Sequence, residues 1–271
     1  QMFEQYGKKL APYIADAWDS SRVGEPTEPT RFSLMDLAER RLSYGNSGYS
    51  LQFMLNTSLS DQERYPLKLS DLVVMDFDNE QGPEKVFWSG APEYALDDLP
   101  NVGLRGDRYH KPFRVQGDYI KWQGTVMTID PSGRGEDETG YAIVSSLNGW
   151  MYAQACSGLR GGYSPENLQK LADLARRHKV NEVLVEANFG DGMFNSLLIP
   201  YLRNTYPVTV TEVKHSQQKE KRIADVLEPV MNQHRLVIPP RLVRDDYASV
   251  GDVPNDKQAS YRLMYQLTRL T

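Results

Sequence analysis

The sequence contains a single cysteine, Cys156, and four histidines among its 271 residues. A lone cysteine cannot form a disulfide within the chain, and it is typical of proteins from reducing compartments. With one cysteine and scattered histidines, the sequence also lacks the ligand spacing of a structural zinc site.

Long hydrophobic runs are absent as well. The apolar runs are far too short to span a bilayer, and the polar, charged start does not have the pattern of a signal peptide, so we expect no membrane partner. The hydrophobic share of 40% and the charged share of 25% are those of an ordinary globular protein. The net charge of −5 argues against a wholly basic nucleic-acid binder but allows a local basic patch.

A phosphate-binding loop is also missing. The segment 72–76 is similar to the acidic strand of an ATPase, but the pattern GxxxxGK[ST] occurs nowhere in the chain. We therefore interpret this segment as an ordinary strand. The chain starts with Gln1 and Met2 and stops at Thr271 inside a helical pattern, so we expect it to be a piece of a longer polypeptide.

The first part of the chain has an irregular pattern. We expect helices at 4–18, 33–44 and 48–56, with a polar linker at 20–30. Residues 77–118 are rich in Gly, Pro and Asp and predict loops with one or two edge strands. We therefore expect residues 1–118 to share no core with a second domain at 119–271.

The pattern becomes regular after residue 120. Strands are predicted at 124–130, 140–146, 150–157, 182–186, 208–213 and 236–238, and helices at 164–178, 191–204, 217–234, 241–249 and 256–271. Three successive strands followed by alternating helices and strands predict a mixed α/β sheet. The short links predict that the first three strands are antiparallel and that the strand at 182–186 lies parallel to the first.

Two carboxylates, Asp130 and Glu186, each end a buried strand. This arrangement suggests a site for hard divalent cations, which can clamp the attacking and leaving oxygens of a phosphodiester. A strand-end Asp can also be only a turn former or a helix cap. Asp137 and Asp191 follow these strands and could support the site from outside, although Asp191 also fits the N-cap of the next helix.

Basic residues cluster at the end of the strand 208–213 and at the start of the helix that follows. Such a run can bind DNA phosphates, or it can be only the solvated face of a helix. Two further arginines lie in glycine-rich stretches. The candidates for phosphate contact are Lys214, Lys219, Lys221, Arg222, Arg134 and Arg160.

Several of these segments together carry a family resemblance. They are 129–135, 137–139, 161–163, 186–194, 218–220, 227–231 and, upstream, 48–55 and 98–103. The run Asn188-Phe189-Gly190-Asp191-Gly192-Met193-Phe194 is the most specific of them. The sequence resembles the large terminase subunit, also called DNA maturase B, of short-tailed phages of the podovirus type.

The resemblance implies a two-part DNA-packaging motor. An N-terminal ATPase domain pumps viral DNA into a capsid, and a C-terminal RNase H-like nuclease domain cuts the concatemer with Mg²⁺ or Mn²⁺ in a two-metal site. Asp130 would contact both metals, and Glu186 would contact one. Residues 1–118 would be the tail of the ATPase half and the linker, 119–271 most of the nuclease, and ATP would be used only by the missing domain.

The resemblance also implies a third acidic ligand, which lies in a His-Asp-Asp context on a late helix of the family. No His-Asp-Asp occurs between Glu186 and Thr271. We interpret Asp245 and Asp246 as a helix cap, and we expect the third ligand to lie beyond Thr271.

The partners implied are double-stranded DNA, the small terminase subunit and the portal or procapsid, in the host cytoplasm. Two alternatives stay open: a docking module of the motor that binds portal or capsid without cutting, and a nuclease of the Holliday-junction resolvase or transposase type. The upstream segment 48–55 argues against the second, since a resolvase needs no such linker.

Overall fold

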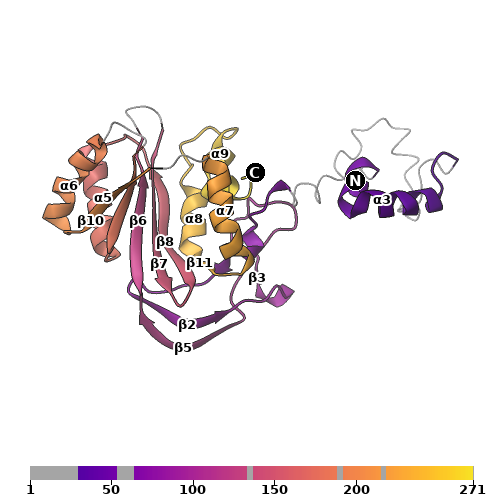
Figure 1. Ribbon diagram of the computed structural model, residues 1–271, viewed down its shortest axis with the longest axis horizontal. Coiled ribbons are helices and arrows are strands. Elements are labelled where there is room, and N and C mark those ends of the chain that lie inside the picture. Colours follow the sequence, from indigo (N-terminus) through magenta and orange to yellow (C-terminus); the bar gives the residue numbers. More distant parts are fainter. Residues whose placement is uncertain (1–29, 54–63, 133–136, 188–191, 215–217, 271) are drawn as a thin grey trace. The chain divides into compact units, whose positions relative to one another are not determined.

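The computed structural model describes residues 30–53, 64–132, 137–187, 192–214 and 218–270, and the chain divides into two compact units, 1–64 and 65–271 (Figure 1). In the first unit, helix α3 (Leu34–Gln52) begins at a capping box in which Ser33 and Asp36 bond each other's backbone N–H groups. The prediction of two separate helices at 33–44 and 48–56 is therefore wrong, because one continuous helix extends to Gln52. The predicted glycine break fails because glycine weakens a helix by only about 1 kcal/mol. The helix expected at 4–18 lies outside the described residues.

The second unit is built on a mixed sheet. Its strands, in spatial order, are β10 (Thr209–Val213), β9 (Glu182–Glu186), β6 (Gly124–Asp130), β7 (Thr139–Leu147), β8 (Trp150–Leu159), β11 (Leu236–Ile238), β1 (Val73–Val74), β4 (Tyr109–His110) and β3 (Ala95–Leu96). The strands predicted after residue 120 are all present, with boundaries shifted by at most two residues.

The strand directions also agree with the sequence. β6, β7 and β8 are sequential and antiparallel, and β9 lies parallel to β6. Asn148 and Gly149 link β7 to β8 with φ values of 49° and 81°. These are the positive φ values of a type I′ turn, whose twist matches that of the flanking strands.

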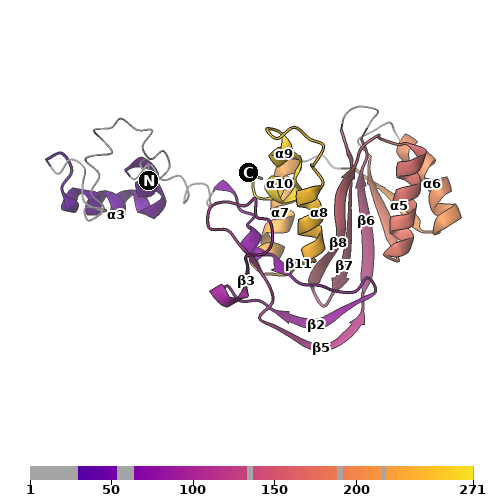
Figure 2. The same cartoon turned by 180° about the vertical axis from the view of Figure 1, so that it is seen from behind.

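Helices cover both faces of the central strands (Figures 1 and 2). On one side, α5 (Pro165–Arg177) and α6 (Met193–Thr205) bury a core that includes Met127, Ile143 and Val183. The other side carries α7 (Lys219–Asn232) and α8 (Pro240–Ala248), and the chain continues through α9 (Gln258–Tyr261) and α10 (Leu263–Leu267). The single helix expected at 256–271 is wrong, because Arg262 has extended backbone angles between α9 and α10.

The upstream segment 65–118 is part of this unit. Leu67, Leu69 and Tyr109 are fully buried and share a core with Met231 and Leu242. β1 is hydrogen-bonded between β11 and β4. The expected boundary at residue 118 is therefore wrong. The composition of 77–118 suggested loops with no core of their own. The segment joins the second unit because a few of its apolar side chains are buried against helices that lie far away in the sequence.

Within 77–118 and the residues just after it, two longer strands pair with each other. β2 (Gln81–Phe87) and β5 (Arg114–Lys121) form a separate two-stranded antiparallel sheet, referred to below as the ribbon. The prediction of loops with one or two edge strands therefore underestimated the order of this segment. In the described part of the chain, no helix is long and apolar enough to cross a membrane.

The shared core predicts how the chain responds to truncation and to a core mutation. A chain that starts at residue 65 should melt close to the temperature of the 271-residue chain. Leu69→Ala should cost about 2–5 kcal/mol of unfolding free energy, because Leu69 is 0% exposed. The measurement is urea unfolding followed by circular dichroism. Leu34→Ala is the control, since Leu34 is 66% exposed on α3. Independent folding of residues 119–271 alone would contradict the shared core.

Candidate functional site

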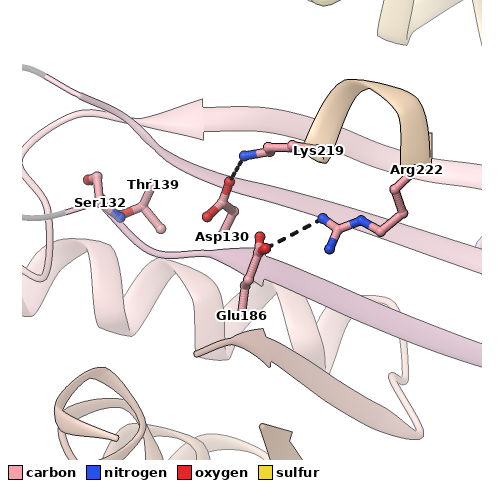
Figure 3. A network of polar contacts seen from close by, with 6 residues as sticks. All are labelled: Asp130, Ser132, Thr139, Glu186, Lys219 and Arg222. Carbon is pink, nitrogen blue, oxygen red and sulfur yellow. Dashed lines mark hydrogen bonds and ion pairs between the residues drawn. The ribbon is translucent and has the colours of Figure 1, made fainter. Parts of the chain in front are cut away.

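The site is formed where two neighbouring strands end. Ile129 of β6 is in register with Val185 of β9, so Asp130 and Glu186 follow at adjacent positions. The residues just before them, Ile129 and Val185, are buried in the core under α5 and α6. Successive side chains alternate across a sheet, so Asp130 and Glu186 point to the opposite face. Figure 3 shows both carboxylates turned toward the start of α7.

Two cations from the first turn of α7 meet these carboxylates (Figure 3). Lys219 Nζ donates a hydrogen bond to Asp130 Oδ2, and Arg222 Nη2 donates to Glu186 Oε1 at 3.4 Å. Residues three apart lie on the same side of a helix, which is why one helix can serve both acids. The hydrogen bond to Asp130 is the main reason why the pKa of Lys219 is raised, so its amine remains charged.

The two ion pairs differ in exposure. The side chains of Arg222 and Glu186 are 20% and 12% exposed, whereas those of Lys219 and Asp130 are 55% and 43% exposed. The Arg222–Glu186 pair is therefore less screened by water and should hold its geometry more firmly. Lys219 is the cation that solvent, or a ligand, can displace more easily.

The donor atoms of the site suit a hard divalent cation. Carboxylate oxygens are the ligands that Mg²⁺ and Ca²⁺ prefer, and two carboxylates at adjoining strand ends can share an ion. A metal ion bound there would compete with Lys219 and Arg222 for the same oxygens. Among the described residues, no group of three His, Cys, Asp or Glu side chains is arranged to hold a metal ion. By their chemistry, Asp130 and Glu186 would supply two protein ligands to such a cation.

A large open cavity surrounds the pair. Its volume is about 1580 Å³, and its wall extends from Asp130 and Glu186 across β7 and β8 to α8 and α10. Several other residues predicted from the sequence also line it. They are Asp137, Arg160, Lys219 and Arg222.

Within the cavity wall, Arg160 Nε is paired with Glu138 Oε1 at 2.8 Å. The other predicted residues lie elsewhere. Lys214 lies 3.9 Å from Glu212 and does not line the cavity, and neither does the exposed Lys221. Arg134 and Asp191 lie outside the described residues, so their predicted roles stay predictions.

The sequence suggested that Asp245 and Asp246 precede a helix as its cap. In the structure, both residues lie within α8. Asp246 nevertheless acts as a cap, because its carboxylate accepts hydrogen bonds from the backbone N–H groups of Leu263 at 2.6 Å and Met264 at 3.1 Å. Burial raises the pKa of Asp246, and these two bonds partly oppose the rise. Asp245 and Asp246 both line the cavity.

Sequence reasoning missed several polar residues of the cavity wall, among them Gln154, His178 and Arg241. Burial, helped by Arg241 and Arg177, lowers the pKa of His178 to about 4, so its ring is neutral at pH 7. Arg241 Nη2 donates to the backbone oxygen of Gln154 at 3.4 Å. No local pattern could have identified them, because they come from β8, the end of α5 and α8 and meet only in the folded chain.

Comparison with known proteins gives a consistent picture. Residues 129–236 match the family described as "Terminase Bacteriophage T7, Ribonuclease H-like domain". The chain is 42% identical over 268 residues to the terminase large subunit of Enterobacteria phage T3, a match that covers 98% of this chain and 46% of that protein. The chain thus spans about half the length of this curated relative.

Solved structures give weaker similarities. The large terminase nuclease from thermophilic phage G20c is 10% identical, with a TM-score of 0.35, over 72% of this chain and 77% of that one. A manganese-soaked, inhibitor-bound human cytomegalovirus terminase nuclease domain is 11% identical, with a TM-score of 0.35, over 45% of this chain and 64% of that one. TM-scores of 0.35 support no conclusion about activity. The RNase H-like fold is supported by the strand order and by the family match over residues 129–236.

The cap made by Asp246 can be separated from a role of the acidic pair in ligand binding. Asp246→Ala should lower the unfolding free energy by about 1–2 kcal/mol, because two backbone donors of α10 lose their acceptor. Asp245→Ala is the matched control and should leave the melting temperature unchanged. The measurement is thermal melting without divalent cations, and equal melting temperatures for the two variants would contradict the capping role.

Proposed function

Because residues 129–236 belong to the RNase H-like domain family of phage T7-type terminases, we propose that the chain is the nuclease part of a viral genome-packaging terminase and cuts concatemeric phage DNA. The observation that carries this proposal is the pair Asp130 and Glu186 at adjoining strand ends, with Lys219 and Arg222 directly beside them. The pair combines oxygen ligands for a divalent cation with cationic groups for a phosphate.

The reaction is the hydrolysis of a DNA phosphodiester. A water oxygen forms a bond to phosphorus, the bond from phosphorus to one sugar oxygen breaks, and that oxygen takes up a proton. Asp130 and Glu186 would hold Mg²⁺ or Mn²⁺, which supplies positive charge to the attacking and leaving oxygens. Asp130 is the central ligand in this proposal, and Glu186 serves one ion.

Lys219 and Arg222 have two uses in this scheme. Without a cation, they neutralise the carboxylates, which reduces the repulsion between two like charges at neighbouring positions. Once the carboxylates bind a cation, both basic side chains can turn to the phosphates of the DNA strand. The planar guanidinium of Arg222 suits two phosphate oxygens at once, whereas Lys219 acts as a mobile point charge.

The proposal extends to the longer protein only through its relative. The phage T3 protein is a terminase large subunit, and this chain covers 46% of it. In a protein of that kind, ATP would drive DNA translocation from a domain outside this chain. The small terminase subunit and the portal or procapsid would be its partners in the host cytoplasm, and the first unit would join the two halves.

One alternative has a specific observation in its favour. Among the residues that the structure describes, no three His, Cys, Asp or Glu side chains are grouped so that they could hold a metal ion. This favours a docking role without cutting for the chain in isolation. A cleavage assay with Mg²⁺ or Mn²⁺ distinguishes the two proposals.

Removing the charge of either carboxylate should impair cutting. Asp130→Asn in the full-length protein should reduce plasmid cleavage to background, because the amide keeps the size of the carboxylate but loses the charge that holds a hard cation. Glu186→Gln should reduce cleavage less severely, since it serves one ion. The measurement is Mg²⁺- or Mn²⁺-dependent cleavage of supercoiled plasmid, with thermal melting and ATP hydrolysis as controls. Wild-type cleavage by Asp130→Asn would eliminate this mechanism.

The two cations should act on DNA binding. Lys219→Ala and Arg222→Ala should each weaken the binding of duplex DNA and lower the slope of log K against log salt by about 1, as expected for one lost phosphate contact. Binding is measured by fluorescence anisotropy on the Asp130→Asn background, so that no cutting interferes. The control is Lys170→Ala, an exposed cation on α5. Unchanged slopes for both site variants would show that these cations serve only the carboxylates.

A further inference from the structure

The β2–β5 ribbon has two unlike faces. Its inner face carries Val86 and Ile120, which pack with Trp122 and the fully buried Tyr152 of β8. This contact fixes the ribbon against the end of the sheet where β6 begins (Figure 2). The outer face has no such cover, and every residue of β5 except Ile120 is exposed.

The register identifies the side chains of the outer face. Residues opposite each other in an antiparallel pair project to the same side. Three pairs alternate with the inner pairs along the ribbon and are exposed, so they form the outer face. They are Gln81–Lys121, Lys85–Gln116 and Phe87–Arg114. The fourth pair, Pro83–Tyr119, adds a tyrosine that is 45% exposed.

The paired positions of this face carry positive charges only. Lys85, Arg114 and Lys121 carry three positive charges, and none of them forms an ion pair within the described part of the chain. These strands also contain two carboxylates, Glu84 and Asp118. Both lie at the β-bulge, where they have no paired residue on the opposite strand. Acidic residues outnumber basic ones in the chain, 36 to 31. The paired positions of this exposed face therefore carry three cations and no acid, although acidic residues are in excess in the chain as a whole.

The neutral side chains of the face fit the same partner. Gln81 and Gln116 offer amides that can bond base edges or phosphates. Phe87 is 38% exposed and touches Phe113, which is 48% exposed, at 6.1 Å between ring centroids. Flat apolar rings next to unpaired cations suit a surface of sugars and bases with phosphates on either side.

We propose that the outer face of the ribbon binds a groove of duplex DNA, as a second DNA-binding element apart from the carboxylate site. The major groove of DNA admits a two-stranded β-ribbon, with cations reaching the phosphates on both sides. The inference rests on the proposed function for the nature of the substrate. It assigns the ribbon a holding role that does not depend on Asp130 or Glu186.

The position of the ribbon separates holding from cutting. β5 ends at Lys121 and β6 begins at Gly124, whereas Asp130 lies at the far end of β6. A strand rises about 3.3 Å per residue, so β6 places the two elements about 20 Å apart along the sheet. Duplex DNA held by the ribbon would thus be retained when the cleavage site is empty.

The test compares two triple variants that lose the same charge. The ribbon variant is Lys85→Ala, Arg114→Ala and Lys121→Ala, and the control variant is Lys170→Ala, Arg203→Ala and Lys257→Ala, three exposed cations elsewhere. Binding of a 30-base-pair duplex to the 271-residue chain is measured by anisotropy in EDTA at several salt concentrations. The ribbon variant should bind at least tenfold more weakly near 0.1 M salt, with a slope smaller by about 2–3. The control variant should bind within twofold of wild type.

Three results would overturn the inference. They are wild-type affinity of the ribbon variant, equal losses in both triple variants, and equal losses for duplex and single-stranded DNA, which would reject a groove. Both variants should melt like the wild type, because all six side chains are exposed. Lys85→Arg with Lys121→Arg should keep the affinity.

The same assay separates this inference from the proposed function. Asp130→Asn should keep the full difference between the ribbon and control variants. If the wild type binds duplex through the ribbon but the full-length protein never cuts plasmid, the proposed function fails and the ribbon inference stands. If plasmid is cut and the ribbon variant binds normally, only the ribbon inference fails. A wild-type chain that binds no duplex would overturn the ribbon inference, while the plasmid assay still decides the function.

Discussion

The parallel pairing of β9 with β6 is the interaction on which the site depends. Asp130 and Glu186 are far apart in sequence, and only the register of these strands brings them to neighbouring positions. A shift of β9 by one residue would turn Glu186 into the apolar core. Its buried neighbour Val185 opposes such a shift, because Val185 would have to leave the core under α5 and α6, and Ile129 holds β6 in the same way. The apolar side chains of the strands therefore hold the charged ones in place.

The second core gives α7 its position. Met231, near the end of this helix, is fully buried with Leu67, Leu69 and Tyr109 from the upstream segment. The first turn of the same helix carries Lys219 and Arg222 to the carboxylates. The segment 65–118 thus supports the site without touching it. This explains physically why the nuclease unit includes residues that composition assigned to a linker.

The sequence was sufficient for the strands and helices between residues 120 and 250, because their periodicity is strong and short links such as Asn148 and Gly149 separate them. It also placed Asp130 and Glu186 at the ends of two parallel strands, which the structure confirms, whereas their role as metal ligands stays a prediction. It failed at α3, where glycines did not end the helix, and at 256–271, where Arg262 interrupts the helix. Both failures concern single backbone positions, whose conformation depends on neighbours that local patterns do not include.

The sequence by itself determined the order of the elements between residues 120 and 250, with two carboxylates at strand ends and cations at the start of α7, because these features depend on local periodicity and on residue type. The tertiary structure alone decided that Lys219 pairs with Asp130 and Arg222 with Glu186, that Asp246 caps a helix after its own, and that Lys214 and Lys221 stay outside the cavity. It also decided which face of the ribbon carries its cations. These are contacts between segments distant in the chain, and they are set by how apolar surfaces pack together, which no single segment specifies.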